Sequence, residues 1–315
     1  MADKNTNIPK LLIICGPTAS GKSELALKLA RELDAEIVNA DSMQVYRGLD
    51  IGTAKPSREQ LAEVPHHLVD VVEPDGTFSA ADFAMAADAA IREISSRGKR
   101  AIVVGGTGLY IRALLKGLVD SPGGSSEMRA ALQDEADRSG NAAMLEKLRL
   151  VDPQLAAGLH PNNLVRIIRA LEVHRLTGIP LSRHQQEHAF STQRYHSLQI
   201  GILVERAELY KRIELRVERM LADGLLDEVR GLLSAGFARE LKALRSIGYK
   251  ESIAHLLGEI PLEEAVRLIK RDTRHYAKRQ LTWFKADPNI LWFEYPEKFD
   301  TILQHVIEFY ERREA

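Results

Sequence analysis

Two glycines, a lysine and a serine near the start of the chain have the spacing of a phosphate-binding loop. In the segment GPTASGKS, Gly16 is followed by four residues and then by Gly21, Lys22 and Ser23. The glycines let successive backbone N–H groups face one anion, the lysine adds a positive charge, and the serine hydroxyl suits a magnesium ion. The pattern predicts that a polyphosphate binds here. It does not say whether that polyphosphate is a nucleotide.

The loop stands between a strand-like and a helix-like segment. Residues 11–15 are an apolar run, and after the loop Leu25, Leu29 and Leu33 recur every four residues, which is typical of a helix that covers a sheet. An anion at the start of that helix would also meet the positive end of the helix dipole. A glycine-rich turn of no function is the alternative, and it does not explain why strand, loop and helix follow in this order.

A carboxylate and a threonine follow two further strand-like segments. Asp41 directly follows residues 36–40. Because ligands gather at the carboxyl ends of strands in open α/β sheets, Asp41 is a candidate catalytic residue. The alternative is that Asp41 caps a turn. Residues 101–105 lead into a glycine-rich turn that contains Thr107. A nucleotide-hydrolysing enzyme usually has an acidic residue at this point, near magnesium. The turn instead suits close backbone approach and a hydroxyl donor to phosphate.

The composition is that of an ordinary globular protein. The chain has 315 residues, of which 45% are hydrophobic and 28% charged, and its formal net charge of −1 argues against wholesale electrostatic binding of nucleic acid. The single cysteine, Cys15, excludes an internal disulfide and a cysteine-based zinc site. The apolar run near the N-terminus is too short for a signal peptide or a membrane span, so we expect a cytoplasmic protein with no membrane partner, and a monomer.

A local basic region lies near the end of the chain. Residues 239–285 contain eleven basic and six acidic residues, a net charge of +5. Within a helix expected from about Leu262, five basic residues share one face at three- and four-residue steps, namely Arg267, Lys270, Arg271, Arg274 and Lys278. A solvated helix face is the alternative, but a stripe of one sign favours a phosphate backbone. Arg166 and Arg169 also project together from an otherwise apolar helix.

The order of these elements predicts the fold class. We expect an α/β protein with a P-loop NTPase-like parallel sheet flanked by helices, formed by residues 1–120 and 196–315, with a helical C-terminal part. Residues 121–195 begin with the flexible segment SPGGSS and show no convincing strand, so an all-helical insertion domain is expected there. A further strand is expected at Leu68–Val72.

Several classes of function remain open on the residues alone. A P-loop small-molecule kinase explains the phosphate loop but not the basic region. A nucleic-acid-dependent ATPase explains the basic region, but no hydrolytic acid or clear arginine finger is present. An RNA-binding protein that has kept the loop without catalysis is a third alternative. A transferase whose leaving group is diphosphate explains the loop, the carboxylate and the basic region together.

Six segments in order resemble the tRNA dimethylallyltransferases, also called isopentenyl-tRNA transferases, of the bacterial type without a zinc finger. They are GPTASGKS (16–23), NADSMQVYRGLDIGTAKP (39–56), VGGTGLYIRALLKGL (104–118), RIIRALEVHRLTG (166–178), SIGYKE (246–251) and YAKRQLTWF (276–284). The resemblance implies transfer of the dimethylallyl group of dimethylallyl diphosphate to N6 of the adenosine immediately 3′ of the tRNA anticodon, with release of diphosphate. It implies Mg²⁺ as cofactor, and dimethylallyl diphosphate and the anticodon stem-loop of tRNA as partners.

The resemblance also implies roles on the donor side of the reaction. The loop would hold the donor's diphosphate rather than ATP, with Mg²⁺ bound through Ser23. Asp41 and Thr107 are the implied catalytic residues, Asp41 as general base and Thr107 in contact with the diphosphate. Arginines of the long helix that follows residues 198–204 would add positive charge as the leaving group departs. The implied donor-binding residues are Gly16, Pro17, Thr18, Ala19, Ser20, Gly21, Lys22, Ser23, Arg212 and Arg216.

On the acceptor side, the target adenine must leave its stack to be modified. The resemblance implies that Ser42, Met43 and Gln44 surround this base, and that the insertion and the C-terminal elements grip the RNA. The implied tRNA-binding residues are Asp41, Ser42, Met43, Gln44, Thr107, Arg129, Val165, Arg166, Ile167, Ile168, Arg169, Arg245, Lys250, Lys278, Arg279 and Gln280. Val165 stands where the family usually has glutamine.

Overall fold

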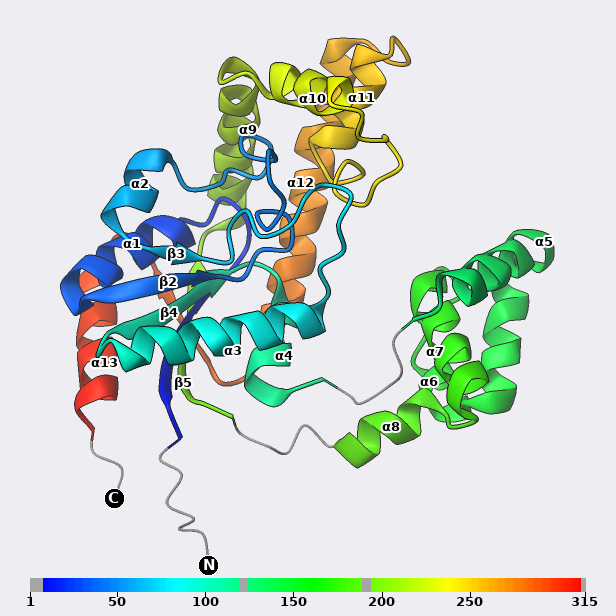
Figure 1. Ribbon diagram of the computed structural model, residues 1–315, viewed down its shortest axis with the longest axis horizontal. Coiled ribbons are helices and arrows are strands. Elements are labelled where there is room, and N and C mark those ends of the chain that lie inside the picture. Colours follow the sequence, from blue (N-terminus) through cyan, green and yellow to red (C-terminus); the bar gives the residue numbers. More distant parts are fainter. Residues whose placement is uncertain (1–7, 119–123, 189–193, 313–315) are drawn as a thin grey trace, which may run out of the picture. The chain divides into compact units, whose positions relative to one another are not determined.

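The computed structural model shows a chain that divides into two units (Figure 1). It describes residues 8–118, 124–188 and 194–312. The larger unit combines Met1–Leu115 with Arg194–Ala315, and the smaller unit is Lys116–Gln193. Among the described residues, no helix is both long and apolar enough to cross a membrane.

The larger unit is built on a six-stranded parallel sheet in the order β3-β2-β4-β1-β5-β6. The strands are β1 (Lys10–Cys15), β2 (Ala35–Asn39), β3 (His66–His67), β4 (Arg100–Gly105), β5 (His196–Leu203) and β6 (Ile290–Glu294). Because β1 lies between β4 and β5, the phosphate loop that follows β1 emerges near the centre of the sheet's carboxyl edge.

Alternation along β1 explains why helices cover both faces of the sheet. Residues 11, 13 and 15 belong to one apolar core, and residues 12 and 14 belong to the core on the opposite face. The covering helices are α3 (Ala80–Ser96) and α4 (Gly108–Lys116) on the first face, and α1 (Lys22–Leu33) and α13 (Phe299–Glu311) on the second. The predicted α/β fold, a parallel sheet flanked by helices, is confirmed.

Four helices of the C-terminal part gather beyond the carboxyl edge of the sheet (Figure 1). They are α9 (Arg206–Ala222), α10 (Leu225–Ser234), α11 (Tyr249–Leu256) and α12 (Leu262–Lys285). Their apolar residues share a core with Val45, Tyr46 and Leu49, which belong to the segment that follows β2. The segment that carries Asp41 is therefore held against these helices.

Between residues 124 and 188 the smaller unit contains helices and no strand, and it has a core of its own. Its helices are α5 (Ser126–Val151), α6 (Pro153–Ala157), α7 (Leu164–Thr177) and α8 (Leu181–His188). Leu132 and Leu148 of α5 and Ile167 of α7 are fully buried in this core. Gly140 has φ 81° and interrupts α5. The all-helical character expected for the insertion is confirmed.

Two parts of the sheet differ from the sequence-based expectation. The prediction of a strand at Leu68–Val72 is wrong. Leu68 and Asp70 have φ values of 62° and 56°, which turn the chain out of an extended conformation. The strand β3 is the short His66–His67 segment instead. The edge strand β6 and the helix α13 were not expected from the sequence.

Candidate active site

The segment GPTASGKS forms the turn between β1 and α1. Ala19 and Gly21 have φ values of 63° and 96°, and a left-handed backbone of this kind brings successive N–H groups around one anion. A side chain at Gly21 would be strained, which explains the glycine. The helix α1 begins at Lys22, so the exposed Ser23 lies in its first turn. The predicted phosphate-binding geometry is present.

Two cations beside this loop have no carboxylate within ion-pair distance in the described part of the chain. The Lys22 ammonium donates a hydrogen bond to the carbonyl of Pro17 at 3.2 Å, and Arg216 of α9 donates one to the carbonyl of Thr53 at 3.4 Å. Burial and the neighbouring Arg216 lower the pKa of Lys22 to about 8, although the charge of Asp41 opposes the shift. Burial also lowers the pKa of Arg216. Two positive charges that repel each other in a desolvated site favour an anionic ligand.

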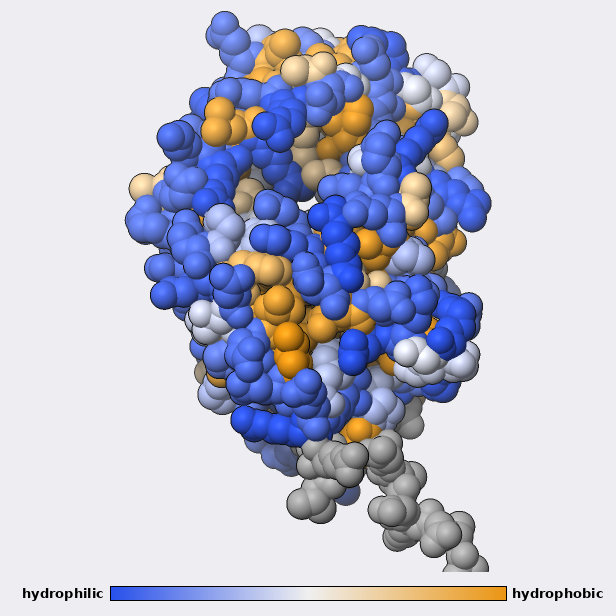
Figure 2. All heavy atoms as spheres, turned by 90° about the vertical axis from the view of Figure 1, so that its left-hand side faces the viewer, coloured by the Kyte–Doolittle hydropathy of each residue, from blue (hydrophilic) through white to orange (hydrophobic). Residues whose placement is uncertain are grey.

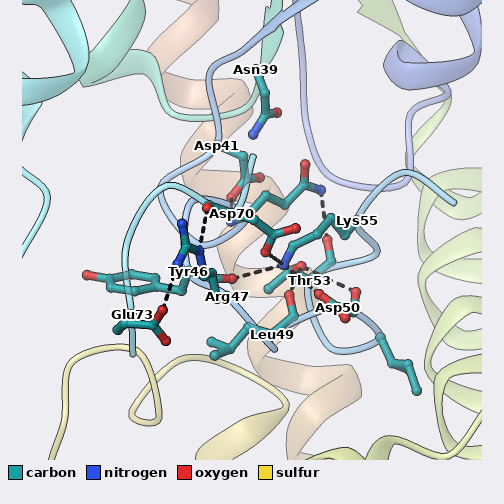
Figure 3. Close-up of polar contacts among 12 residues, drawn as sticks. Asn39, Asp41, Tyr46, Arg47, Leu49, Asp50, Thr53, Lys55, Asp70 and Glu73 are labelled. Carbon is teal, nitrogen blue, oxygen red and sulfur yellow. Dashed lines mark hydrogen bonds and ion pairs between the residues drawn. The ribbon is translucent and has the colours of Figure 1, made fainter. Parts of the chain in front are cut away.

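Asp41 has one carboxylate oxygen held by the backbone and one that is not. Its Oδ1 accepts the N–H groups of Met43 at 2.8 Å and Gln44 at 3.3 Å, whereas no donor among the described residues reaches Oδ2 (Figure 3). The side chain is thereby oriented, and its second oxygen is left to accept a proton. Asp41 lines a pocket of about 310 Å³ together with Thr18 of the phosphate loop and Arg216.

Thr107 lies beside Asp41 because the ends of β2 and β4 approach closely. A side chain at Gly105 would come within 2.1 Å of the Ala40 carbonyl oxygen, so only glycine permits this approach. The Thr107 hydroxyl oxygen accepts the N–H of Ser42 at 3.1 Å, and the hydroxyl also forms a hydrogen bond with the side chain of Tyr276.

The pocket is apolar on the side formed by α9 and α12. Ile213, Val217 and Met220 of α9 and Ile269 of α12 line it, and the polar side chains of Asp41 and Thr18 belong to the same lining. Six of the residues proposed from the sequence line this pocket, namely Thr18, Asp41, Ser42, Met43, Arg216 and Arg245. An apolar wall that faces a few convergent polar groups is typical of a small-molecule site.

Two predicted contact residues, Gln44 and Gln280, are buried and hold the walls of the site together. The Gln44 amide donates to the carbonyls of Thr53 and Ala54 at 3.0 and 3.1 Å. The Gln280 amide donates to Gly106 at 2.9 Å and accepts the N–H of Thr18 at 2.8 Å. Gln280 therefore joins the phosphate loop to the turn after β4, a structural role that the sequence did not indicate.

The basic stripe expected on α12 is largely paired with carboxylates, and its contact with a phosphate backbone stays a prediction. Four of its five members contact carboxylates, in the pairs Arg267–Glu264, Lys270–Glu218, Arg271–Asp272 and Arg274–Glu214. Lys250 likewise lies 3.2 Å from Asp272. Lys278, Arg279 and Arg245 are exposed and make no ion pair with a described carboxylate.

Arg212, which was predicted to bind the donor, does not line the pocket. It pairs with Glu208 at 2.7 Å on the surface of α9.

The residues proposed on the smaller unit separate into exposed and buried groups. Val165 and Arg166 are exposed, and Arg166 has no ion pair with a described carboxylate. Arg129 and Arg169 contact the buried carboxylate of Glu172. Ile167 and Ile168 are 0% and 7% exposed in the core of the unit. The predicted role of Ile167 and Ile168 as tRNA contacts stays a prediction, and their buried side chains mean that it would depend on backbone groups.

Two residues that were not predicted from the sequence contribute to the site, Glu228 from outside the pocket lining and Tyr276 as part of that lining. Burial together with the charge of Asp41 raises the pKa of Tyr276. Its position one helical turn before Gln280 was the available signal. Glu228 of α10 accepts the N–H groups of Asp50, Ile51 and Gly52 at 3.0, 2.7 and 3.2 Å. No local pattern in the sequence indicates that contact.

A phosphate loop that faces a carboxylate across a partly apolar pocket defines a P-loop enzyme of the α/β class. The family model described as IPP transferase matches residues 44–287. The chain is 70% identical over 304 residues to tRNA dimethylallyltransferase 1 of Pelobacter propionicus, a match that covers 96% of this chain and 98% of the relative. The chain belongs to the IPP transferase family.

Solved structures agree with this assignment. The full-length tRNA isopentenylpyrophosphate transferase from Bacillus halodurans is 40% identical, with a TM-score of 0.72 over 96% of this chain and 97% of that chain. A eukaryotic dimethylallyltransferase described as acting on tRNA is 28% identical, with a TM-score of 0.78 over 98% of this chain and 81% of that chain.

Proposed function

We propose that this chain transfers the dimethylallyl group of dimethylallyl diphosphate to N6 of the adenosine at position 37 of tRNA, immediately 3′ of the anticodon, and releases diphosphate. One observation carries the proposal. Asp41, Thr18 and Arg216 line the same pocket, so a proton acceptor and groups that bind diphosphate face one cavity. The similarity to relatives that are named tRNA dimethylallyltransferase supports the same reaction.

Asp41 acts on the nucleophile. The exocyclic amine of adenine is a poor nucleophile because its lone pair is delocalised into the ring. The free Oδ2 of Asp41 accepts the N6 proton while the bond from nitrogen to the allylic carbon forms. The bond from that carbon to oxygen breaks at the same stage, and diphosphate leaves with the electron pair.

The phosphate loop and its cations act on the leaving group. Lys22, the Thr107 hydroxyl and Arg216 offset the negative charge that grows on the departing diphosphate. The Ser23 hydroxyl is exposed in the first turn of α1, and Mg²⁺ prefers oxygen ligands. The described residues contain no cluster of three or more acidic, histidine or cysteine side chains, so Mg²⁺ would be held through Ser23 and the phosphate oxygens. Bound there, Mg²⁺ would supply further positive charge to the leaving group.

The apolar wall of the pocket fits the hydrocarbon part of the donor. Ile213, Val217 and Ile269 offer no hydrogen-bonding groups, and an allylic chain against them loses contact with water. Exclusion of water also protects the reactive carbon from hydrolysis.

The exposed cations are proposed to bind the anticodon stem-loop. Arg166 on the smaller unit and Arg245, Lys278 and Arg279 on the larger unit are exposed without carboxylate partners among the described residues. Contacts of this kind position an RNA backbone while the target base leaves its stack. Because tRNA is the acceptor, we propose that the reaction takes place in the cytoplasm. We also expect the protein to act as a monomer.

The proposal is tested by incubating the protein with unmodified tRNA, Mg²⁺ and dimethylallyl diphosphate. After digestion to nucleosides, mass spectrometry is expected to show adenosine that carries one dimethylallyl group. Absence of this product with every tRNA in the pool would refute the proposal. A parallel measurement of thermal unfolding is expected to show greater protection by dimethylallyl diphosphate than by ATP. Protection by ATP alone would favour a kinase or an ATPase.

A further inference from the structure

We propose that Lys55 is a positioning residue for this transfer, because its buried ammonium fixes the loop that orients both Asp41 and Arg216. The inference rests on the proposed function, since it concerns the same pocket. Lys55 itself does not line that pocket, so any effect on catalysis must act through the groups that do.

The Lys55 ammonium joins three separate points of the chain. Its side chain is only 4% exposed, and Nζ lies 2.9 Å from the Tyr46 carbonyl, 2.5 Å from Asp50 Oδ1 and 2.6 Å from Asp70 Oδ1 (Figure 3). An ammonium has three N–H donors, and three acceptors receive them. The segments around residues 46, 50 and 70 are thereby tied together.

Two hydrogen bonds through Gln44 lead from Ala54, the residue before Lys55, to Asp41. Ala54 has the left-handed φ of 48°, an unfavourable conformation that its neighbour Lys55 helps to hold. The carbonyl of Ala54 accepts the Gln44 amide at 3.1 Å, and the N–H of Gln44 is donated to Asp41 Oδ1 at 3.3 Å. Displacement of the turn at residues 53–54 would therefore change the orientation of the Asp41 carboxylate.

The same turn also orients Arg216. The Arg216 guanidinium donates to the Thr53 carbonyl at 3.4 Å, and the Gln44 amide donates to that carbonyl at 3.0 Å. One turn thus receives hydrogen bonds that lead to the proposed base and to the proposed leaving-group cation. Lys55, which follows this turn directly, sets the distance between the two.

Loss of the ammonium should displace the loop without unfolding the protein. The side chains of Asp50 and Asp70 are 59% and 42% exposed, so both carboxylates can hydrate when Lys55 is removed. Their mutual repulsion then pushes the two segments apart. Glu228 still binds the N–H groups of Asp50 and Ile51, and the helical core behind the loop is untouched.

Lys55 also lines a second pocket, through which a small amine can reach its place. This pocket has a volume of about 810 Å³ and lies between α2 (Arg58–Glu63) and α9. Figure 2 shows the corresponding face of the larger unit, which is mostly hydrophilic and hollowed in its upper half. An alkylammonium ion supplied in solution can therefore replace the missing side chain of a Lys55→Ala variant.

The test measures transfer by Lys55→Ala with saturating tRNA and donor. Because misplacement by about 1 Å can cost about 10²-fold in rate, we expect kcat to fall by about that factor while the Kd for tRNA changes by less than about threefold. Propylammonium, which matches the deleted atoms, is expected to raise the kcat of the variant at least about tenfold, and the increase should saturate with propylammonium concentration. Propan-1-ol, of similar size but uncharged, is expected to restore none.

Lys10→Ala is the matched control. Lys10 is a partly buried lysine whose ammonium donates to the carbonyls of Phe309 and Tyr310, at the start of β1 and away from the pocket. Its loss should leave kcat unchanged with and without propylammonium. Asp70→Asn is a second variant that keeps the side-chain shape, and we expect it to lower kcat without rescue by propylammonium.

Four outcomes would overturn the inference. They are a kcat for Lys55→Ala within twofold of wild type, an effect on the KM for tRNA alone, equal rescue by propan-1-ol, and equal rescue of Lys10→Ala. If Lys55→Ala does not fold, unchanged kcat in Asp70→Asn would overturn it as well. A wild-type protein without transfer activity would refute the proposed function, and the inference with it. An active wild type with an unaffected Lys55 variant would refute the inference alone.

Discussion

The two units differ in whether charged side chains that are removed from water have partners of opposite charge. At the phosphate loop of the larger unit, Lys22 and Arg216 are half-buried near each other without a carboxylate in ion-pair contact among the described residues. In the smaller unit, the carboxylate of Glu172 is 0% exposed but contacts Arg129 at 2.9 Å, Arg169 at 2.6 Å and the Ser125 N–H at 2.9 Å. One site has cations without a carboxylate in ion-pair contact, and the other has a carboxylate with its cations in place.

This difference separates a ligand site from a structural one. A buried charge that keeps its partners holds the surrounding elements in position, whereas a buried charge without partners costs stability and indicates a missing anion. The pKa of Lys22 falls from 10.5 to about 8, which corresponds to a folding penalty on the order of 3 kcal/mol. Because the pKa is lowered in the folded state, the penalty is complete below pH 8 and disappears as the pH rises past 10.5.

Replacement of Lys22 by methionine is expected to have the largest effect on activity. Without this cation the phosphate loop loses charge that stabilises the leaving diphosphate, so kcat/KM for the donor should fall by about 10²- to 10³-fold. The free energy of unfolding should not decrease, because an uncompensated buried charge is removed. Steady-state kinetics and thermal unfolding at pH 7 measure the two effects.

The pH dependence of donor binding provides the control for Lys22. An anion that pairs with the ammonium raises its pKa, so wild-type protein should take up a proton when a diphosphate monoester binds above pH 8. Calorimetry in buffers of different ionisation enthalpy measures that proton, and the Lys22→Met variant should not take it up. Proton release, or equal uptake in both proteins, would contradict the assignment of Lys22 to the ligand.

Asp41→Asn tests a carboxylate whose charge acts on both Lys22 and Arg216. The variant keeps the side-chain shape but cannot accept the N6 proton, so kcat is expected to fall by at least about 10²-fold with unchanged affinity for tRNA. Single-turnover transfer and filter binding measure the two quantities. Normal turnover in this variant would remove Asp41 from its role as base.

Glu172→Gln tests the paired site in the smaller unit. Removal of the negative charge leaves Arg129 and Arg169 facing an amide, and we expect a loss of about 2 kcal/mol, below the usual range because both arginines are partly exposed. Hydrogen exchange of the α5 and α7 amides measures local stability. The control is Glu146→Gln, which removes an exposed pair with Arg149 and should cost less than about 1 kcal/mol. Equal effects of the two substitutions would show that burial of Glu172 is unimportant.

Features with a local signature could be predicted from the sequence. The phosphate loop, the strand before it and the helix after it occupy one continuous segment, and the end of β2 placed Asp41 at the carboxyl edge of the sheet. The edge strand β6 was missed because its five residues, ILWFE, form a short run without clear alternation. The turns at Leu68 and Asp70 depend on contacts with distant segments, such as the bond from the Asp70 N–H to the Gln44 carbonyl.

Charge pairing between helices could not be predicted from a single helix. The acidic partners of Lys270 and Arg274 are Glu218 and Glu214 on α9, more than fifty residues earlier in the chain. The spacing on α12 correctly grouped the basic residues on one face, but it contained no information on the helix packed against that face. Gln44 and Gln280 show the same limit, since the sequence identified both and gave no sign that their amides contact backbone across the site.

Two lysines of α12, one with a carboxylate partner and one without, allow the smallest of the predicted effects to be measured. Lys278 has no carboxylate partner among the described residues, whereas Lys270 lies 2.6 Å from Glu218. Lys278→Glu is expected to weaken tRNA binding by about threefold to tenfold at low salt. The slope of the logarithm of the binding constant against the logarithm of the salt concentration should also decrease by about one, which corresponds to one counterion. Lys270→Glu is the matched control and should change affinity less, because the Lys270 charge is already offset. If both substitutions weaken binding equally, ion pairing within the protein does not decide which cations are available to RNA.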